Sequence, residues 1–338
     1  MTMRCFTPEQ DALYARGWPH VVVLDDDTTE RKPSLAKLYK KYLGVFPISR
    51  WPRAMAHALV RACTAIQTGA IATWQPTGTA TDTAPITIAD ARAAIARQLG
   101  APRRRSYVAD EHLVLCIEAL IGPDAALELI VDALAGLPRE RWPRPGDPFD
   151  PDAVAMNPNM APQIHRANVL YENSNVGSFA YLAGYLLLRA SNADARARLE
   201  ALWQATTDAG AIAGEETLRG GLDLALHGSD AMRRLAPWSH WQYLYCWGLV
   251  DDEALLRARF AARDKAQWDP DPRHVWSCPA LVDVVFRKPV LRALGDRRLQ
   301  FLENVGMFDH PAVVALMRDW AADKKSGAFA TRWLAEHA

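Results

Sequence analysis

Apolar residues recur along this chain at the spacing of an α-helix, and glycine or proline separates one run from the next. Residues 112–121, HLVLCIEALI, are almost continuously apolar, as expected of a helix covered on more than one side. Gly122 and Pro123 follow, and a second apolar stripe then runs to Gly136. Such a short connection forces two helices to fold back on each other, so we expect an antiparallel helical hairpin here.

The same pattern predicts helices throughout the chain. Two-helix units of about 35 to 45 residues have the spacing of an α-solenoid. We therefore predict an all-α fold in which antiparallel helical hairpins stack on one another in a right-handed array. The predicted helices lie at 7–17, 34–43, 53–68, 88–99, 112–121, 127–134, 178–190, 194–203, 216–227, 241–247, 311–320 and 329–333.

Two segments suggest a family resemblance. Residues 308–334, FDHPAVVALMRDWAADKKSGAFATRWL, resemble a HEAT-type helical pair. Residues 208–230, DAGAIAGEETLRGGLDLALHGSD, resemble the divergent HEAT-like arrays of GC-rich bacteria. The resemblance covers the last two thirds of the chain loosely and rests on apolar spacing. It implies a bacterial interaction scaffold with a concave binding face, and it supplies no catalytic residues.

One segment interrupts the helical pattern. Residues 138–163 contain seven prolines, which exclude a long helix, and an asparagine-rich stretch follows. A connection of this length is a linker, a surface wrap or a functional flap. We therefore predict a helical subdomain at 1–137, a Pro/Asn-rich linker or flap at 138–175, and a HEAT-like subdomain at 176–338.

Charge and cysteine content narrow the classes of partner. Lysine plus arginine and aspartate plus glutamate number 39 each, so no net field attracts nucleic acid or an anionic membrane. The first residues, MTMRCFTPEQ, lack the apolar core of a signal peptide, and no run reaches the roughly 20 apolar residues of a membrane span. The five cysteines form no C-x-x-C pair, which favours reduced thiols. We expect a soluble cytoplasmic protein with no membrane partner.

An acidic cluster is the first candidate for chemistry. The apolar run of HVVVLDDDTTE, residues 20–30, leads to Asp25, Asp27 and Glu30. After a strand, Asp-x-Asp-x-Thr resembles the first motif of haloacid-dehalogenase-type phosphotransferases, which implies Asp25 as nucleophile, Asp27 as general acid/base and a bound Mg²⁺. On a helix, Asp-Asp-x-x-x-Glu resembles the metal-binding cluster of helical prenyl-chain enzymes. The third interpretation, an acidic turn that caps the next helix, requires no cofactor.

Two histidine groups are further candidates. His274 and Cys278 would form a base and a thiol nucleophile if they faced each other. Gly228 after His227 is typical of a helix C-cap, which favours a structural role for that histidine. A base, a carboxylate and a nucleophile could instead come together from His227, Asp230, Ser239 and His240.

Tryptophan provides the candidate binding residues. The chain contains 12 tryptophans, and several lie near predicted loops. Aromatic side chains with polar edges occur in cores and at binding surfaces. Trp142, Trp268 and Trp276 would mark a peptide or partner groove if they lined one surface.

We predict a non-enzymatic helical-repeat module that binds another protein, as a scaffold or as an inhibitor of the immunity-protein type. No cofactor is required for this function. The alternative is a Mg²⁺-dependent enzyme that acts on a phosphate or diphosphate ester through Asp25 and Asp27. A third hypothesis, a HEAT-like enzyme of nucleic acids, would require a basic concave face despite the zero net charge.

Overall fold

A computed structural model describes two compact parts of the chain. The larger unit comprises residues 24–44 and 50–240, and the smaller unit comprises residues 1–23, 45–49 and 241–338. The described residues are 21–25, 48–65, 85–100, 110–139, 175–211, 218–234, 248–261, 302, 306, 311–324 and 326–337.

The described residues are mostly helical, which confirms the all-α prediction at the level of fold class. One small two-stranded sheet departs from it, formed by β1 (Val21–Asp25) and β2 (Ile48–Pro52). Three successive valines begin β1, and their β-branched side chains favour an extended backbone. The strand at 48–52 was not predicted.

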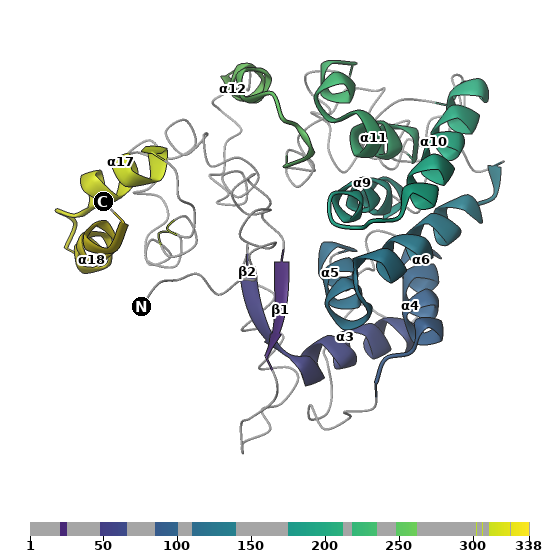
Figure 1. Cartoon of the computed structure of the whole chain (residues 1–338), viewed down its shortest axis with the longest axis horizontal. Coiled ribbons are helices and arrows are strands. Elements are labelled where there is room, and N and C mark those ends of the chain that lie inside the picture. The colour runs from purple at the N-terminus through teal and green to yellow at the C-terminus, as the bar shows by residue number, and fades with distance from the viewer. Residues whose placement is uncertain are drawn as a thin grey trace, which may run out of the picture. The chain divides into compact units, whose positions relative to one another are not determined.

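The helices of the larger unit contact one another in two layers (Figure 1). In one layer, α3, α5, α9 and α11 touch in succession, and in the other α4, α6 and α10 do so. Contacts of α3 with α4, α5 with α6, α6 with α9 and α10 with α11 join the layers. The bounds are α3 Arg53–Ala65, α4 Ile88–Gly100, α5 Asp110–Ile121, α6 Pro123–Ala135, α9 Asn175–Leu187, α10 Ala193–Asp208 and α11 Leu218–Arg234.

The predicted hairpin at 112–136 is confirmed. Helix α5 ends at Ile121, α6 begins at Pro123, and the two helices pack against each other. Gly122 between them has a φ of 87°, a left-handed conformation that favours glycine. Proline at the first position of α6 costs nothing, because that residue's N–H would have no partner inside the helix.

Helix α9 forms the centre of the larger unit. All residues from 176 to 186 are buried, so this helix is covered on every side. It crosses α11 at very short range: a Cβ atom added to Gly184 would lie 2.6 Å from Cα of Ala225, and one added to Gly221 would lie 2.5 Å from the carbonyl oxygen of Gly177. Glycine at these positions lets the two backbones touch.

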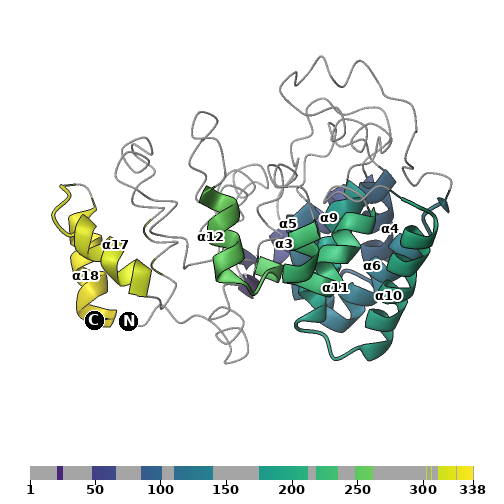
Figure 2. The same ribbon diagram turned by 90° about the horizontal axis from the view of Figure 1, so that it is seen from above.

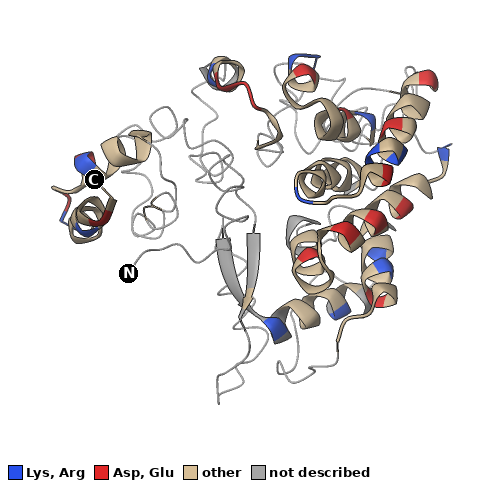
Figure 3. Cartoon of the chain, viewed as in Figure 1, with Lys and Arg blue, Asp and Glu red and all other residues tan. Residues whose placement is uncertain are grey.

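Acidic side chains on one face of α6 bind the other two helices of the second layer, α4 and α10 (Figure 3). Arg198 of α10 donates to Glu128 at 3.0 Å and to Asp132 at 2.6 Å. Arg92 of α4 reaches the same Asp132 at 3.2 Å. Asp124 accepts a hydrogen bond from the backbone N–H of Ser191, just before α10, at 2.9 Å. Side chains four residues apart on α6 therefore connect it to both neighbouring helices.

One ion pair lies inside the larger unit. The guanidinium of Arg189, just after α9, donates to Glu118 of α5 at 2.7 Å, and both side chains are largely buried. Burial raises the pKa of Glu118, although the nearby positive charge of Arg189 acts in the opposite direction. Burial therefore shifts the pKa of Glu118 more than the charge of Arg189 does.

The smaller unit contains α12 (Glu253–Ala261), α17 (Pro311–Trp320) and α18 (Gly327–His337). Helices α17 and α18 pack side by side, as predicted for the end of the chain (Figure 2). The indole N–H of Trp333 donates to the carbonyl oxygen of Gly306 at 2.6 Å. Helix α12 was not predicted; the Asp252 side chain caps it by accepting from the N–H of Leu255 at 2.9 Å.

Several predicted elements lie outside the described residues: the helices at 7–17, 34–43 and 241–247, and the Pro/Asn-rich segment from residue 140 to residue 174. The division at 138–175 therefore stays a prediction. Helices α6 and α9, on either side of it, pack together in the larger unit. Across the described ranges, every helix is too short or too polar to cross a membrane.

Candidate functional site

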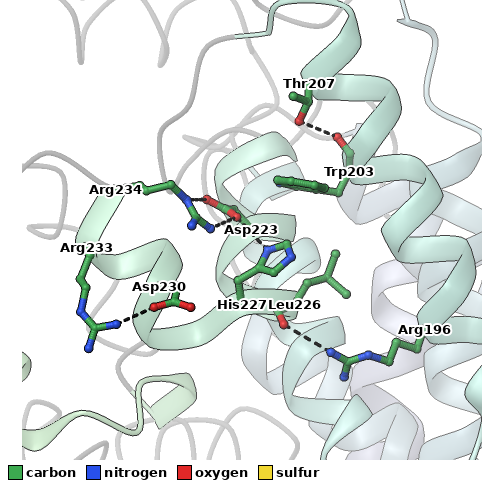
Figure 4. Close-up of polar contacts among 9 residues, drawn as sticks. All are labelled: Arg196, Trp203, Thr207, Asp223, Leu226, His227, Asp230, Arg233 and Arg234. Carbon is green, nitrogen blue, oxygen red and sulfur yellow. Dashed lines mark hydrogen bonds and ion pairs between the residues drawn. The ribbon is translucent and has the colours of Figure 1, made fainter.

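The candidate site is centred on His227 and Asp223 of α11 (Figure 4). These residues are four positions apart, so they share one face of the helix. Nδ1 of His227 lies 2.9 Å from Oδ1 of Asp223. The carboxylate is buried, with 10% of its side chain exposed, whereas 35% of the histidine side chain is exposed. A buried acceptor therefore orients a partly exposed imidazole.

Arg234 secures the carboxylate from the other side. Its Nε donates to Oδ2 of Asp223 at 3.2 Å, and a terminal nitrogen donates to Oδ1 at 2.7 Å. These hydrogen bonds raise the pKa of Arg234, which keeps a positive charge beside Asp223. Both oxygens of the Asp223 carboxylate therefore accept hydrogen bonds from Arg234.

The hydrogen bond to Asp223 determines which imidazole nitrogen carries the hydrogen. A carboxylate only accepts hydrogen bonds, so Nδ1 of His227 carries the hydrogen that it shares with Asp223. In the neutral imidazole, Nε2 then carries the lone pair. Within the described part of the chain, Nε2 has no hydrogen-bond partner. The arrangement can therefore present a basic or nucleophilic nitrogen in a fixed orientation.

Trp203 of α10 completes the group, which we call the His227 cluster: Trp203, Asp223, His227 and Arg234. The ring centroids of Trp203 and His227 are 4.7 Å apart, and the planes are tilted by 60°. The indole nitrogen is buried and has no hydrogen-bond partner among the described residues. Arg196, about two turns earlier on α10, donates to the carbonyl oxygen of Leu226 at 3.4 Å.

The sequence identified one member of this cluster, His227. Asp230, the carboxylate proposed to orient it, instead pairs with Arg233 at 2.5 Å and is largely exposed. The bend at Gly228, where φ is 43° and ψ is −110°, interrupts the helix between His227 and Asp230. Ser239 and His240 lie outside the described residues.

Asp223, and not Asp230, is the carboxylate that orients the imidazole of His227. Its position in the sequence could have indicated this role. Its position four residues before His227 is the spacing that places two side chains together on a helix. Arg234 and Trp203 had no such signal. The first is brought near by the bend at Gly228, and the second by the packing of α10 on α11.

The side chains of the other candidate residues lie outside the described part of the structure. Asp25 ends β1, but its side chain is not among those described, and Asp27 and Glu30 lie outside the described residues. The same holds for Trp142, Trp268, Trp276, His274 and Cys278. Where side chains are described, no group of three or more His, Cys, Asp or Glu residues could hold a metal ion.

Comparison with known proteins adds no relative. No family model matches the chain, and no curated protein or solved structure matches it significantly.

Proposed function

We propose that this chain is a non-enzymatic helical-repeat module that binds another protein. The observation that carries the proposal is the two-layer order of helix contacts in the larger unit. Helix α3 contacts α5, α4 contacts α6, α5 contacts α9, α6 contacts α10, and α9 contacts α11. Arrays built from stacked helical hairpins have the same alternating contacts. A HEAT-like solenoid has this contact pattern, and such arrays function by presenting an extended surface to a partner.

The burial pattern indicates which surface is open. Helix α9 is buried from 176 to 186, so its layer is covered on both sides at that point. Half of the residues of α10 are exposed, and beside it the partly exposed imidazole of His227 lies against Trp203. Aromatic and arginine side chains are enriched among the residues that dominate binding energy. We therefore place the partner on the edge formed by α10 and α11.

A charge-reversal experiment tests this surface. Arg196 and Arg233 have about half of their side chains exposed, at 52% and 51%, and lie on α10 and α11. The tagged chain and its Arg196→Glu, Arg233→Glu variant are used to capture proteins from cells that produce the chain. A captured protein is then purified and titrated calorimetrically against each form.

Arg97→Glu on the exposed side of α4 is the matched control. We expect one protein to bind the natural chain and the Arg97→Glu variant alike, and to bind the double variant about tenfold or more weakly. Equal affinity for all three forms would remove the α10 and α11 edge from the proposal. Failure to reconstitute any complex from purified components would remove the protein-binding function.

A second function is favoured by one observation at the other candidate site. Strand β1 ends at Asp25, which is where the phosphotransferase-like motif requires a strand to end. The alternative is therefore a Mg²⁺-dependent enzyme that acts on a phosphate or diphosphate ester through Asp25 and Asp27. Mg²⁺ should then raise the melting temperature of the natural chain and leave an Asp25→Asn, Asp27→Asn variant unchanged. No Mg²⁺ effect on the natural chain would exclude this alternative.

A further inference from the structure

We propose that Nε2 of His227 is a phosphorylation site that accepts a phosphoryl group from a small donor of the acyl phosphate or phosphoramidate class. This goes beyond protein binding, because it assigns a covalent modification to the exposed edge of α10 and α11. The proposal rests on the geometry of the His227 cluster and on a second histidine that serves as an internal reference.

Nucleophilic attack requires an accessible nitrogen lone pair. Asp223 accepts the hydrogen on Nδ1 at 2.9 Å, so the lone pair is on Nε2, and 35% of the side chain is exposed. The negative charge of Asp223 also stabilises the positive charge that develops on the ring as Nε2 attacks. Orientation and charge therefore both favour reaction at this nitrogen.

Two arginines contact residues next to His227: Arg234 binds Asp223, and Arg196 donates to the carbonyl oxygen of Leu226 and to Glu200. A guanidinium has five N–H donors, and Arg234 uses two of them on Asp223. Arg196 is bound to the carbonyl of Leu226, the residue before His227, and is 52% exposed. Arginine is the side chain best suited to phosphate oxygens, because its planar donors match their geometry.

The reaction balances without a further reagent. With acetyl phosphate, the Nε2 lone pair forms the N–P bond while the P–O bond to the acyl oxygen breaks, and acetate leaves with the electron pair. Nδ1 keeps the hydrogen that it shares with Asp223, so the first product is an N-phosphorylated imidazolium ring with one positive charge and an anionic phosphoryl group. Loss of the Nδ1 proton to water then leaves the ring neutral. With phosphoramidate, ammonia leaves after taking up a proton from water.

His337 is the internal reference. Its Nδ1 lies 2.8 Å from the carbonyl oxygen of Trp333, so it too has its hydrogen on Nδ1. Its ring also lies against a tryptophan, with centroids 4.4 Å apart. The two histidines thus share a tautomer and an aromatic neighbour, and they differ in whether a charged carboxylate or a neutral carbonyl accepts the Nδ1 hydrogen.

The test is incubation of the full chain with acetyl phosphate and, separately, with phosphoramidate. Phosphorylation is followed by phosphorus NMR and by peptide mass spectrometry at neutral pH, since N–P bonds of histidine are labile in acid. We expect phosphorylation at His227 to be about tenfold faster than at His337, and His227→Gln to lose that signal. Asp223→Asn should lower the rate at His227 to that at His337.

If the Asp223→Asn variant fails to fold, the natural chain still tests the proposal, because the rates at His227 and His337 are compared within it. In concentrated urea the two histidines should react at equal rates, because the Asp223 contact is lost. Equal rates in the folded natural chain, or no phosphoryl group on His227, would overturn the proposal.

Discussion

Arg234 donates two hydrogen bonds to Asp223 although the residues are 11 positions apart in the same helical segment. In a straight α-helix this separation would place their backbones roughly 16 Å apart, beyond the reach of the two side chains. Gly228 makes the contact possible, because its φ of 43° and ψ of −110° turn the last residues of α11 back toward Asp223. The bend thus secures the carboxylate that orients His227.

Replacing Gly228 by alanine should destabilise the larger unit by about 1–3 kcal/mol, because side chains rarely adopt this backbone conformation. The free energy of unfolding, measured in urea, tests this. Gly136→Ala is the control: Gly136 has helical angles, with φ at −78° and ψ at −3°. Equal stability of the Gly228→Ala variant and the natural chain would show that the bend is not strained for alanine.

Gly221→Ala should lower the free energy of unfolding by about 1–3 kcal/mol through overpacking. The new methyl group would lie 2.5 Å from the carbonyl oxygen of Gly177, and a backbone atom cannot rotate away as a side chain can. Urea unfolding beside the Gly136→Ala control measures the effect. An unchanged midpoint would mean that α9 and α11 do not approach as closely as described.

Arg189→Met should destabilise the larger unit by about 3–5 kcal/mol at pH 7, because it leaves Glu118 buried without its partner. The loss should be smaller at low pH. Burial raises the pKa of Glu118, so the folded chain holds a proton more tightly than the unfolded chain, and stability rises as pH falls through the folded-state pKa.

Urea unfolding of the Arg189→Met variant between pH 5 and pH 8 (about the range in which most domains are stable) tests this dependence. An Arg189→Met, Glu118→Gln variant is the control and should lack it. A pH-independent loss in the single variant would contradict burial of an ionised Glu118.

Asp132→Asn should remove part of the acid sensitivity of the fold. The hydrogen bond from Arg198 lowers the pKa of Asp132, so its stabilising effect is complete above the unfolded-state pKa and is lost as pH falls through the folded-state pKa. Because the pair is partly exposed and screened by solvent, the effect should be about 0.5 kcal/mol. Acid titration of both forms by circular dichroism should show the difference, and coincident curves would contradict it.

The sequence predicted those helices whose ends are marked by local chemistry. Gly122 and Pro123 indicated the turn between α5 and α6 correctly. Gly228 was expected to end a helix at His227, but in the structure it bends α11, which continues to Arg234. The sequence did not show that helix resumes after Gly228 and continues to Arg234. From sequence alone, a glycine that bends a helix cannot be distinguished from a glycine that ends one. Here the hydrogen bond between Arg234 and Asp223 holds the residues after Gly228 in place.

The candidate site was less predictable for the same reason. The bond between Asp223 and His227 is local and follows from helical spacing. The contact between Trp203 and His227 depends on how α10 packs on α11, and no spacing along the chain encodes it. Asp230 is closer to His227 in sequence than Asp223 is, but the bend at Gly228 separates them.

Hydrogen exchange in the presence and absence of the purified partner tests the central claim most directly. We expect slower exchange on binding in α10 from Arg196 to Gln204 and in α11 from Leu226 to Arg234. Exchange in the buried helix α9 should not change. Protection confined to α17 and α18, or no protection at any helix, would contradict binding through the α10 and α11 edge.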